Sequence, residues 1–193
     1  MNQSSANQDD QRLIQLTLDG QQEAFGHLIR KYQDRLYNGM VHFLRDPAEA
    51  EYVVQDAFIL AMTRLDSFKG NSQFFTWLYR IAYNVAITRL RRKKPTVSIQ
   101  GNENTLRLTL PDEGPAPDSR MVQQESVSQL MQAMERLSEE HRSILVLREM
   151  EELEYEAISE ILDLPVGTVR SRLHRARSQL KQLLELIMGE VDS

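Results

Sequence analysis

The side chains best suited to binding chemistry lie on one predicted helix near the end of the sequence. Residues 164–184 contain five Lys or Arg and no Asp or Glu. Apolar residues recur there every three or four positions, which predicts an amphipathic helix, and Pro165 suits its first turn. The opposite side carries small polar groups flanked by cations, namely Gly167, Ser171, His174 and Ser178 beside Arg170, Arg175, Arg177 and Lys181. Such a face can bind phosphates and base edges.

The segment before this helix is strongly acidic. Residues 139–163 hold nine Asp or Glu against Arg142 and Arg148, together with a short amphipathic run from Tyr155 to Leu162. A short helix, a tight turn through Asp163 and a basic helix form the sequence pattern of a helix-turn-helix, whose second helix enters the DNA major groove. An ordinary bundle helix with a solvated basic face is the alternative at this point.

A second candidate binding stretch lies in the first half of the chain. Residues 67–102 hold seven Lys or Arg and no acidic residue, and six of the thirteen aromatic residues fall within 68–83. Cations that contact phosphates and rings that stack on unpaired bases are what single-strand binding requires. On a helix predicted from about Gln73, the residues Trp77, Arg80 and Asn84 form a mixed aromatic, cationic and amide row.

The alternative for these aromatic residues is that they fill the core. We expect this for one face of the same helix, which comprises Phe74, Leu78, Ile81 and Val85. Trp77, Arg80 and Asn84 lie to the side of that face or away from it. They remain candidates for stacking on a base, holding a phosphate and hydrogen-bonding a base edge.

Catalytic and metal chemistry have little support in the sequence. The chain has no cysteine, its four histidines are scattered, and neither a phosphate-binding glycine loop nor a ligand cluster with metal spacing is present. We therefore expect a protein that is not an enzyme, with no catalytic residues, no metal and no cofactor.

Composition sets the wider limits. The 193 residues are 41% apolar and 26% charged, with a net charge of −5, and the positive charge gathers in the segments described above. Glycine and proline are few, which favours an all-helical fold. The polar N-terminus has no apolar leader and no apolar run approaches the roughly 18 residues that a membrane span needs, so we expect a cytoplasmic protein without membrane insertion.

The order of patterns predicts two small helical domains joined by a flexible linker. Residues 1–8 are expected to be a disordered tail, 9–94 the first domain, 95–121 the linker and 122–189 the second domain. Four of the six prolines lie in the linker. Asp46, before Pro47, and Ser138 are predicted helix N-caps, because their side-chain oxygens can accept from the free backbone N–H groups of a first turn.

Several motifs in a fixed order resemble one family over nearly the full length. They are Ala24-Phe25-x-x-Leu28 with Tyr32, the run Val53–Phe58, residues 65–84, Leu137-Ser138-Glu139-Glu140, and residues 165–172. Together these are similar to bacterial sigma factors of the extracytoplasmic-function type (group IV), which retain only the second and fourth sigma regions.

The resemblance implies roles for particular residues. The −10 element would be bound, as a melted strand with one base flipped out, by Phe68, Lys69, Gly70, Asn71, Ser72, Trp77, Arg80 and Asn84. The −35 duplex would be bound by Thr168, Arg170, Ser171, Arg172, His174, Arg175 and Arg177. Core RNA polymerase would be contacted through its β′ clamp helices by Glu51, Gln55 and Asp56, and through its β flap by the fourth region. An anti-sigma factor is the other implied partner.

Two positions depart from the family pattern. The docking segment usually carries an acid three residues before its Gln, where this chain has Tyr52, with Glu51 beside it. His174 stands where relatives vary, which leaves the −35 sequence open. The rival interpretation is a stand-alone helix-turn-helix regulator that never joins the polymerase, but it assigns no role to residues 67–102.

Overall fold

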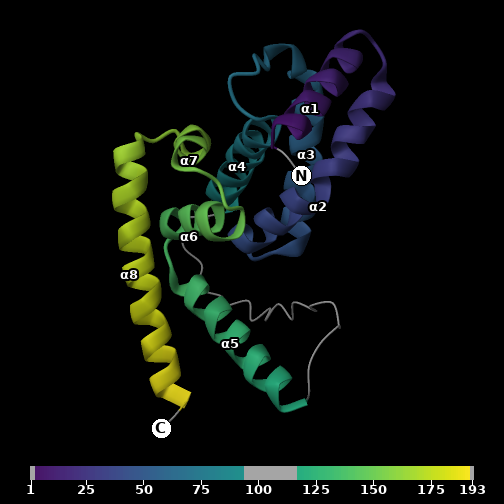
Figure 1. Cartoon of the computed structure of the whole chain (residues 1–193). Coiled ribbons are helices and arrows are strands. Elements are labelled where there is room, and N and C mark those ends of the chain that lie inside the picture. The colour runs from purple at the N-terminus through teal and green to yellow at the C-terminus, as the bar shows by residue number, and fades with distance from the viewer. Residues whose placement is uncertain (1–2, 94–116, 192–193) are drawn as a thin grey trace.

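The computed structural model describes residues 3–93 and 117–191, and within these ranges the only regular secondary structure is helical. The all-helical fold class predicted from the sequence is confirmed (Figure 1). The first half contains four helices and a short 3-10 turn: α1 (Gln3–Leu18), α2 (Gln22–Leu44), α3 (Pro47–Thr63), η1 (Leu65–Ser67) and α4 (Phe74–Lys93). The second contains α5 (Pro117–Arg136), α6 (Glu139–Leu145), the π-helical turn η2 (Val146–Met150), α7 (Tyr155–Leu162) and α8 (Val166–Val191).

Local chemistry sets several helix ends. The Asp46 side chain accepts a hydrogen bond from the Glu49 backbone N–H at 3.1 Å, with Pro47 in the first turn of α3. The Ser138 hydroxyl accepts from the His141 backbone N–H at 3.3 Å, at the start of α6. Both predicted N-caps are therefore confirmed, because each pairs a donor that the helix itself leaves free.

The first helix is longer than predicted. Residues 1–8 were expected to be a disordered tail, but α1 begins at Gln3. Its anchor is Asp10, which is buried and bonds both Lys31 and Tyr32 of α2. The residues before Asp10 include no glycine or proline, so the anchored helix continues towards the N-terminus without a break.

The predicted linker, residues 95–121, overlaps the structure only in part. Residues 94–116 lie outside the described residues, whereas residues 117–121 belong to α5. The helix begins at Pro117, a residue whose fixed φ and missing N–H suit the first position of a helix. The second helical half therefore starts earlier than the position 122 expected from the apolar pattern.

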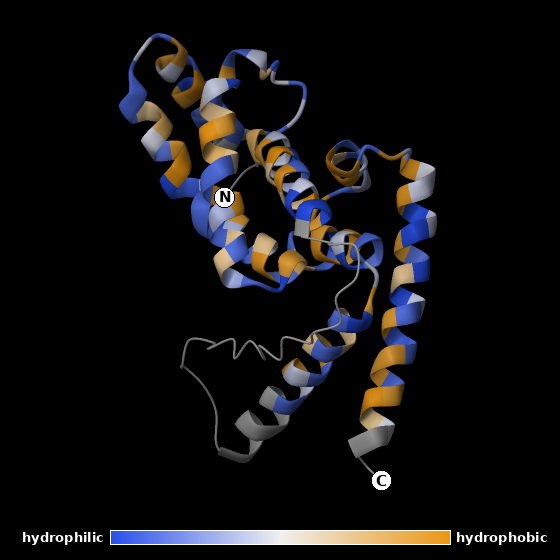
Figure 2. Cartoon of the chain, turned by 180° about the vertical axis from the view of Figure 1, so that it is seen from behind, coloured by the Kyte–Doolittle hydropathy of each residue, from blue (hydrophilic) through white to orange (hydrophobic). Residues whose placement is uncertain are grey.

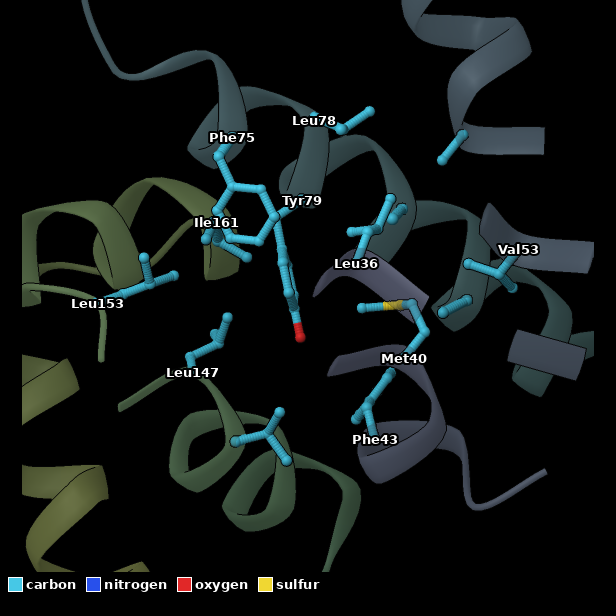
Figure 3. Close-up of a cluster of buried hydrophobic side chains, with 14 of the residues drawn as sticks. Leu36, Met40, Phe43, Val53, Phe75, Leu78, Tyr79, Leu147, Leu153 and Ile161 are labelled. Atoms are coloured by element: carbon cyan, nitrogen blue, oxygen red, sulfur yellow. The ribbon is translucent and has the colours of Figure 1, made fainter. Parts of the chain in front are cut away.

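The two halves pack against each other. Tyr79 of α4 is 1% exposed, and Figure 3 shows it beside Leu147 of η2 and facing Leu36 and Met40 of α2. One continuous cluster of buried apolar side chains runs through both halves. In Figure 1, α6 and α7 lie between α8 and the first half, and α5 and α8 diverge below them.

Candidate nucleic-acid interfaces

The loop before α4 has an aromatic base and a polar tip. The Phe68 ring lies 5.3 Å from the Trp77 ring and 5.8 Å from the Phe74 ring, measured between centroids. Lys69, Gly70 and Asn71 are exposed, and Gly70 takes a φ of +72° that favours glycine. The ring contacts hold the loop in one shape, and its tip is open to a ligand.

The row predicted along α4 is accessible. Arg80 and Asn84 are exposed, whereas Trp77 is half-buried because one side of its ring packs on Phe68 and Phe74. On the α4 face predicted to be buried, Phe74 and Leu78 are fully buried, whereas Ile81 and Val85 are half-buried. The surface thus offers a cation, an amide and part of an indole ring.

A second buried face of α4 was not anticipated. Phe75 and Tyr79 are 3% and 1% exposed, and Ala82 and Ala86 are fully buried on the same side. Figure 3 shows Phe75 beside Ile161 and Tyr79 beside Leu147, both residues of the second half. The available signal was a helix that is apolar nearly all round, which indicates burial on more than one side.

The basic helix α8 has the two sides that its sequence predicts. Val169, Leu173 and Ala176 are at most 2% exposed, and Figure 2 shows apolar and polar residues alternating along its length. The opposite side is exposed at Arg170, Ser171, His174 and Arg175, and Thr168 in the first turn is half-buried. This side has the chemistry of a major-groove surface.

Two of the predicted DNA-contacting cations are paired with acids of the same half. An Nη atom of Arg172 lies 3.2 Å from Glu140 Oε2, and the Arg172 side chain is only 20% exposed. Arg177 donates twice to Glu149 Oε1, at 2.9 and 2.6 Å. These pairs attach α8 to the acidic segment before it and so orient the helix.

The run of glutamates between 149 and 156 is not one solvated face. Glu151 is 6% exposed and bonds Arg35 of the first half. Burial raises the pKa of the Glu151 carboxyl, and the Arg35 guanidinium partly opposes this by lowering that pKa. Glu151 therefore finds its basic partner, Arg35, within the chain.

The predicted polymerase contact lies on the outer side of α3. Glu51, Gln55 and Asp56 are exposed, and the Gln55 amide donates to Glu51 Oε1 at 3.4 Å. Sequence reasoning missed the large apolar residues that share the exposed part of the helix: Tyr52, Ile59 and Met62 are 56%, 62% and 41% exposed. An exposed patch of this kind marks a protein contact more often than a lone apolar residue does.

Other kinds of site find no support in the described residues. Over the described ranges, no three His, Asp or Glu side chains are placed to hold a metal ion. None of the helices that the structure describes is both long and apolar enough to span a membrane.

Family models match both halves of the chain. The model of sigma-70 region 2 covers residues 28–96, and that of sigma-70 region 4 covers residues 128–180. The chain is 39% identical to the ECF RNA polymerase sigma factor SigW of Bacillus subtilis, over 86% of this chain and 92% of that protein. It is 38% identical to the RNA polymerase sigma-H factor of Pseudomonas aeruginosa, over 95% and 97% of the two chains.

Solved structures share the fold. CnrH, in complex with the cytosolic domain of CnrY, matches with a TM-score of 0.67 at 24% identity and covers 92% of this chain and 98% of its own. The sigma factor RpoE of Bartonella quintana, in complex with the anti-sigma factor NepR, matches with a TM-score of 0.67 at 23% identity, over 83% and 96% of the two chains. With both sigma regions matched in order and relatives aligned over nearly the whole length, the chain belongs to the extracytoplasmic-function sigma factors of bacterial RNA polymerase.

Proposed function

We propose that this alternative sigma factor divides promoter recognition between two surfaces. The loop at residues 68–72 and the row Trp77, Arg80 and Asn84 bind the melted −10 strand, and the exposed side of α8 binds the −35 duplex. The observation that carries this proposal is that each half presents its cations and amides outward while its apolar residues are buried. A stand-alone regulator has no use for the first of these surfaces.

The −10 surface suits an unpaired base. Flipping a base out of the stack costs a few kcal/mol, so the receiving pocket must be formed in advance. The contacts of Phe68 with Phe74 and Trp77 supply that rigidity. The tip of the loop then offers Lys69 and Asn71 to the base and its phosphates, and Asn84 reads a neighbouring base edge. Ser72 joins them once its hydroxyl leaves Glu160 Oε1, to which it donates at 2.9 Å in this structure.

The −35 surface suits duplex DNA. Arg170, Ser171, His174 and Arg175 face the major groove, where one arginine bound through two hydrogen bonds to guanine gives about 1–3 kcal/mol of discrimination. Thr168 lies in the first turn of α8, at the positive end of the helix dipole, which favours a phosphate. Arg172 and Arg177 contribute positive charge near the backbone while their acidic partners fix the angle of the helix.

Core polymerase would bind the outer side of α3. Glu51, Gln55 and Asp56 supply polar contacts to the β′ clamp helices, and the exposed rings and chains of Tyr52 and Ile59 supply buried area. Tyr52 takes the place of the expected acid, and the Arg89 guanidinium lies 5.4 Å from its ring. The fourth region would contact the β flap.

The remaining assignments follow from family membership. Two structures with this fold are complexes with a second protein, and in one of them the sigma factor RpoE is bound to the anti-sigma factor NepR. We extend to this chain an anti-sigma partner, a cytoplasmic location and the absence of any catalytic activity of its own.

Reconstitution with core polymerase tests the proposal. The chain and core enzyme are mixed with a promoter library randomised at both elements, and the transcripts are sequenced. We expect a stable holoenzyme that selects two short elements about 25 base pairs apart, roughly 85 Å along B-form DNA. Duplex binding without holoenzyme formation would instead indicate the stand-alone regulator.

A matched pair of variants tests the division of labour. Asn84→Ala should slow promoter opening and leave −35 duplex affinity within about twofold, because an exposed side chain of α4 is replaced without disturbing α8. Thr88→Ala, one turn further along α4 and also exposed, is the control. Equal losses of opening and −35 affinity would contradict separate surfaces.

A further inference from the structure

We propose that Tyr155, the first residue of α7, is a positioning residue for the −35 element: its ring holds the Arg170 guanidinium of α8 in the direction in which it reads a base. The inference rests on the proposed function, because it concerns how one residue of the −35 surface is oriented. It adds a residue from the first helix of the helix-turn-helix to a surface whose other members all belong to α8.

Arg170 is held by a ring and not by an acid. Its guanidinium carbon lies 5.5 Å from the centroid of the Tyr155 ring, within the distance at which a cation is attracted to an aromatic face. Within the described ranges, no carboxylate pairs with Arg170, whereas Arg172 and Arg177 of the same helix each have one. Arg170 is nevertheless exposed, so the ring is the group that limits its movement.

A ring orients a guanidinium without using its donors. The five N–H groups of an arginine lie in the guanidinium plane, and the attraction to a ring needs none of them. Arg170 over the Tyr155 ring can therefore still donate two hydrogen bonds to the O6 and N7 atoms of a guanine. A carboxylate partner, by contrast, accepts these same hydrogen bonds, as Glu149 does from Arg177.

Tyr155 is itself held in place. Its side chain is half-buried and packs on the core. The Arg148 guanidinium lies 5.0 Å from the centroid of the same ring, and Arg148 Nη1 donates to the Leu153 carbonyl at 2.7 Å. The same Nη1 lies 3.5 Å from Glu154 Oε2. These contacts attach the ring to the loop that precedes α7, and a fixed ring can fix the direction of a second cation.

The contact lies where a helix-turn-helix meets DNA. Tyr155 begins α7, and Arg170 is the fifth residue of α8, which begins at Val166. Such proteins contact base edges with the N-terminal residues of the second helix, while the first helix crosses the backbone. Figure 1 shows α7 beside the N-terminal end of α8. The ring therefore links the two helices at the end that faces the major groove.

Holding Arg170 in advance lowers the cost of binding. An arginine side chain has several rotatable bonds, and contact with a base fixes them at an entropic cost. The Tyr155 ring restricts these bonds before DNA arrives, so the remaining cost is smaller. The sign of the effect is defined, because a ring that Arg170 had to leave in order to reach DNA would oppose binding.

The base preference of the reconstituted holoenzyme tests the inference. Core polymerase with the wild-type chain or a variant transcribes a promoter library randomised at the −35 element, and sequencing of the transcripts gives the preference at each position. Arg170→Ala identifies the position that Arg170 reads, where the preference is lost. We expect Tyr155→Leu, which keeps an apolar side chain but removes the ring, to reduce the preference at that position by about two- to fivefold. The other positions should be unchanged.

Three further variants separate orientation from stability. Tyr155→Phe keeps the ring and loses only the hydroxyl, so it should retain the wild-type preference. Leu162→Ala shortens another half-buried residue of α7 and should leave the relative preference at every position unchanged, whatever total transcription it loses. The double variant of Tyr155→Leu and Arg170→Ala should have the same preference as Arg170→Ala alone, because the ring acts through the arginine.

Several results would overturn the inference. They are an equal fall at all −35 positions in Tyr155→Leu, a loss in Tyr155→Phe as large as in Tyr155→Leu, and a stronger preference once the ring is removed. An unchanged preference at every position in Arg170→Ala would overturn it as well, because the ring would then orient no base contact. A wild-type holoenzyme without any −35 preference would count against the proposed function instead.

Discussion

Arginines of the same helix differ in what they contact. In α8, Arg175 is exposed and its Nε donates to the Ser171 backbone carbonyl at 3.3 Å. Arg177 makes two bonds to one carboxylate oxygen of Glu149. A side chain held by a local carbonyl can turn to a base at small cost, whereas a paired one must first leave a carboxylate. Arg175 is therefore the better candidate for reading sequence.

Replacing Arg175 should weaken −35 binding selectively. We expect Arg175→Ala to reduce affinity for a −35 duplex by about 1–3 kcal/mol, the value of one specific arginine–guanine contact. Fluorescence anisotropy on a labelled duplex gives the affinity, and gel filtration with core enzyme should show unchanged holoenzyme. Lys181→Ala, which removes the same charge from an exposed position of α8, is the control. If Lys181→Ala reduces the duplex affinity as much as Arg175→Ala does, the Arg175 contact is only electrostatic.

His42 should make stability depend on pH. Burial lowers the pKa of His42 below its ordinary value of 6.5, and its Nδ1 is buried with no hydrogen-bond partner among the described residues. As pH falls below 6.5, the unfolded chain binds a proton that the folded chain does not. The free energy of unfolding should therefore decrease in that range.

Denaturant titrations of a variant isolate this effect. The difference in unfolding free energy between the wild type and His42→Gln should be constant above about pH 7 and should shift in favour of the variant as pH falls towards 5.5. His27→Gln, in the same helix but exposed, is the matched control. A difference independent of pH would show that the His42 proton is not coupled to folding.

At the scale of elements, the helix-turn-helix depends on a small apolar contact. Ile158 and Ile161 of α7 are buried together with Val169 and Leu173 of α8. Asp163, between the helices, takes a left-handed φ of 53° that ends α7 and turns the chain. The direction of the recognition surface therefore depends on packing behind it.

Shortening Leu173 should disturb both stability and DNA binding. We expect Leu173→Ala to lower the free energy of unfolding by about 2–5 kcal/mol, because a buried leucine leaves a cavity. Leu186→Ala, in the same helix but 59% exposed, should change it by less than about 0.5 kcal/mol. Chemical denaturation measures both. Similar losses would mean that Leu173 is not part of a packed interface.

At the scale of the molecule, sequence reasoning succeeded where information is local. The all-helical fold follows from apolar spacing, and the caps at Asp46 and Ser138 follow from the residue types beside each first turn. Burial of Phe74 and Leu78 follows from helical periodicity. Each of these depends on residues only a few positions apart.

What sequence reasoning missed depends on distant residues. Arg35 and Glu151 are 116 positions apart. The residues beside each of them in the sequence do not distinguish this guanidinium or this carboxylate from an ordinary surface charge. The second buried face of α4 likewise exists because the other half covers it. The −10, −35 and polymerase-contacting residues lie at accessible or half-buried positions, and their roles remain predictions.

The continuous core predicts how the whole molecule unfolds. Because buried side chains of both halves form one cluster, we expect a single cooperative transition in which the calorimetric and van't Hoff enthalpies agree. Arg35→Ala removes the ion pair and the stacking on Phe75, and so weakens the coupling between halves. Its unfolding should broaden or divide into two transitions.

The control for this measurement is an arginine of the same half that does not reach the second half. Arg12→Ala removes an exposed cation from α1 and should keep the single transition. Differential scanning calorimetry at one protein concentration and one salt concentration compares the three chains. Two transitions already present in the wild type would mean that the interface contributes too little free energy to couple the halves. A single transition in Arg35→Ala would place the coupling in the apolar contacts around Tyr79 and not in the ion pair.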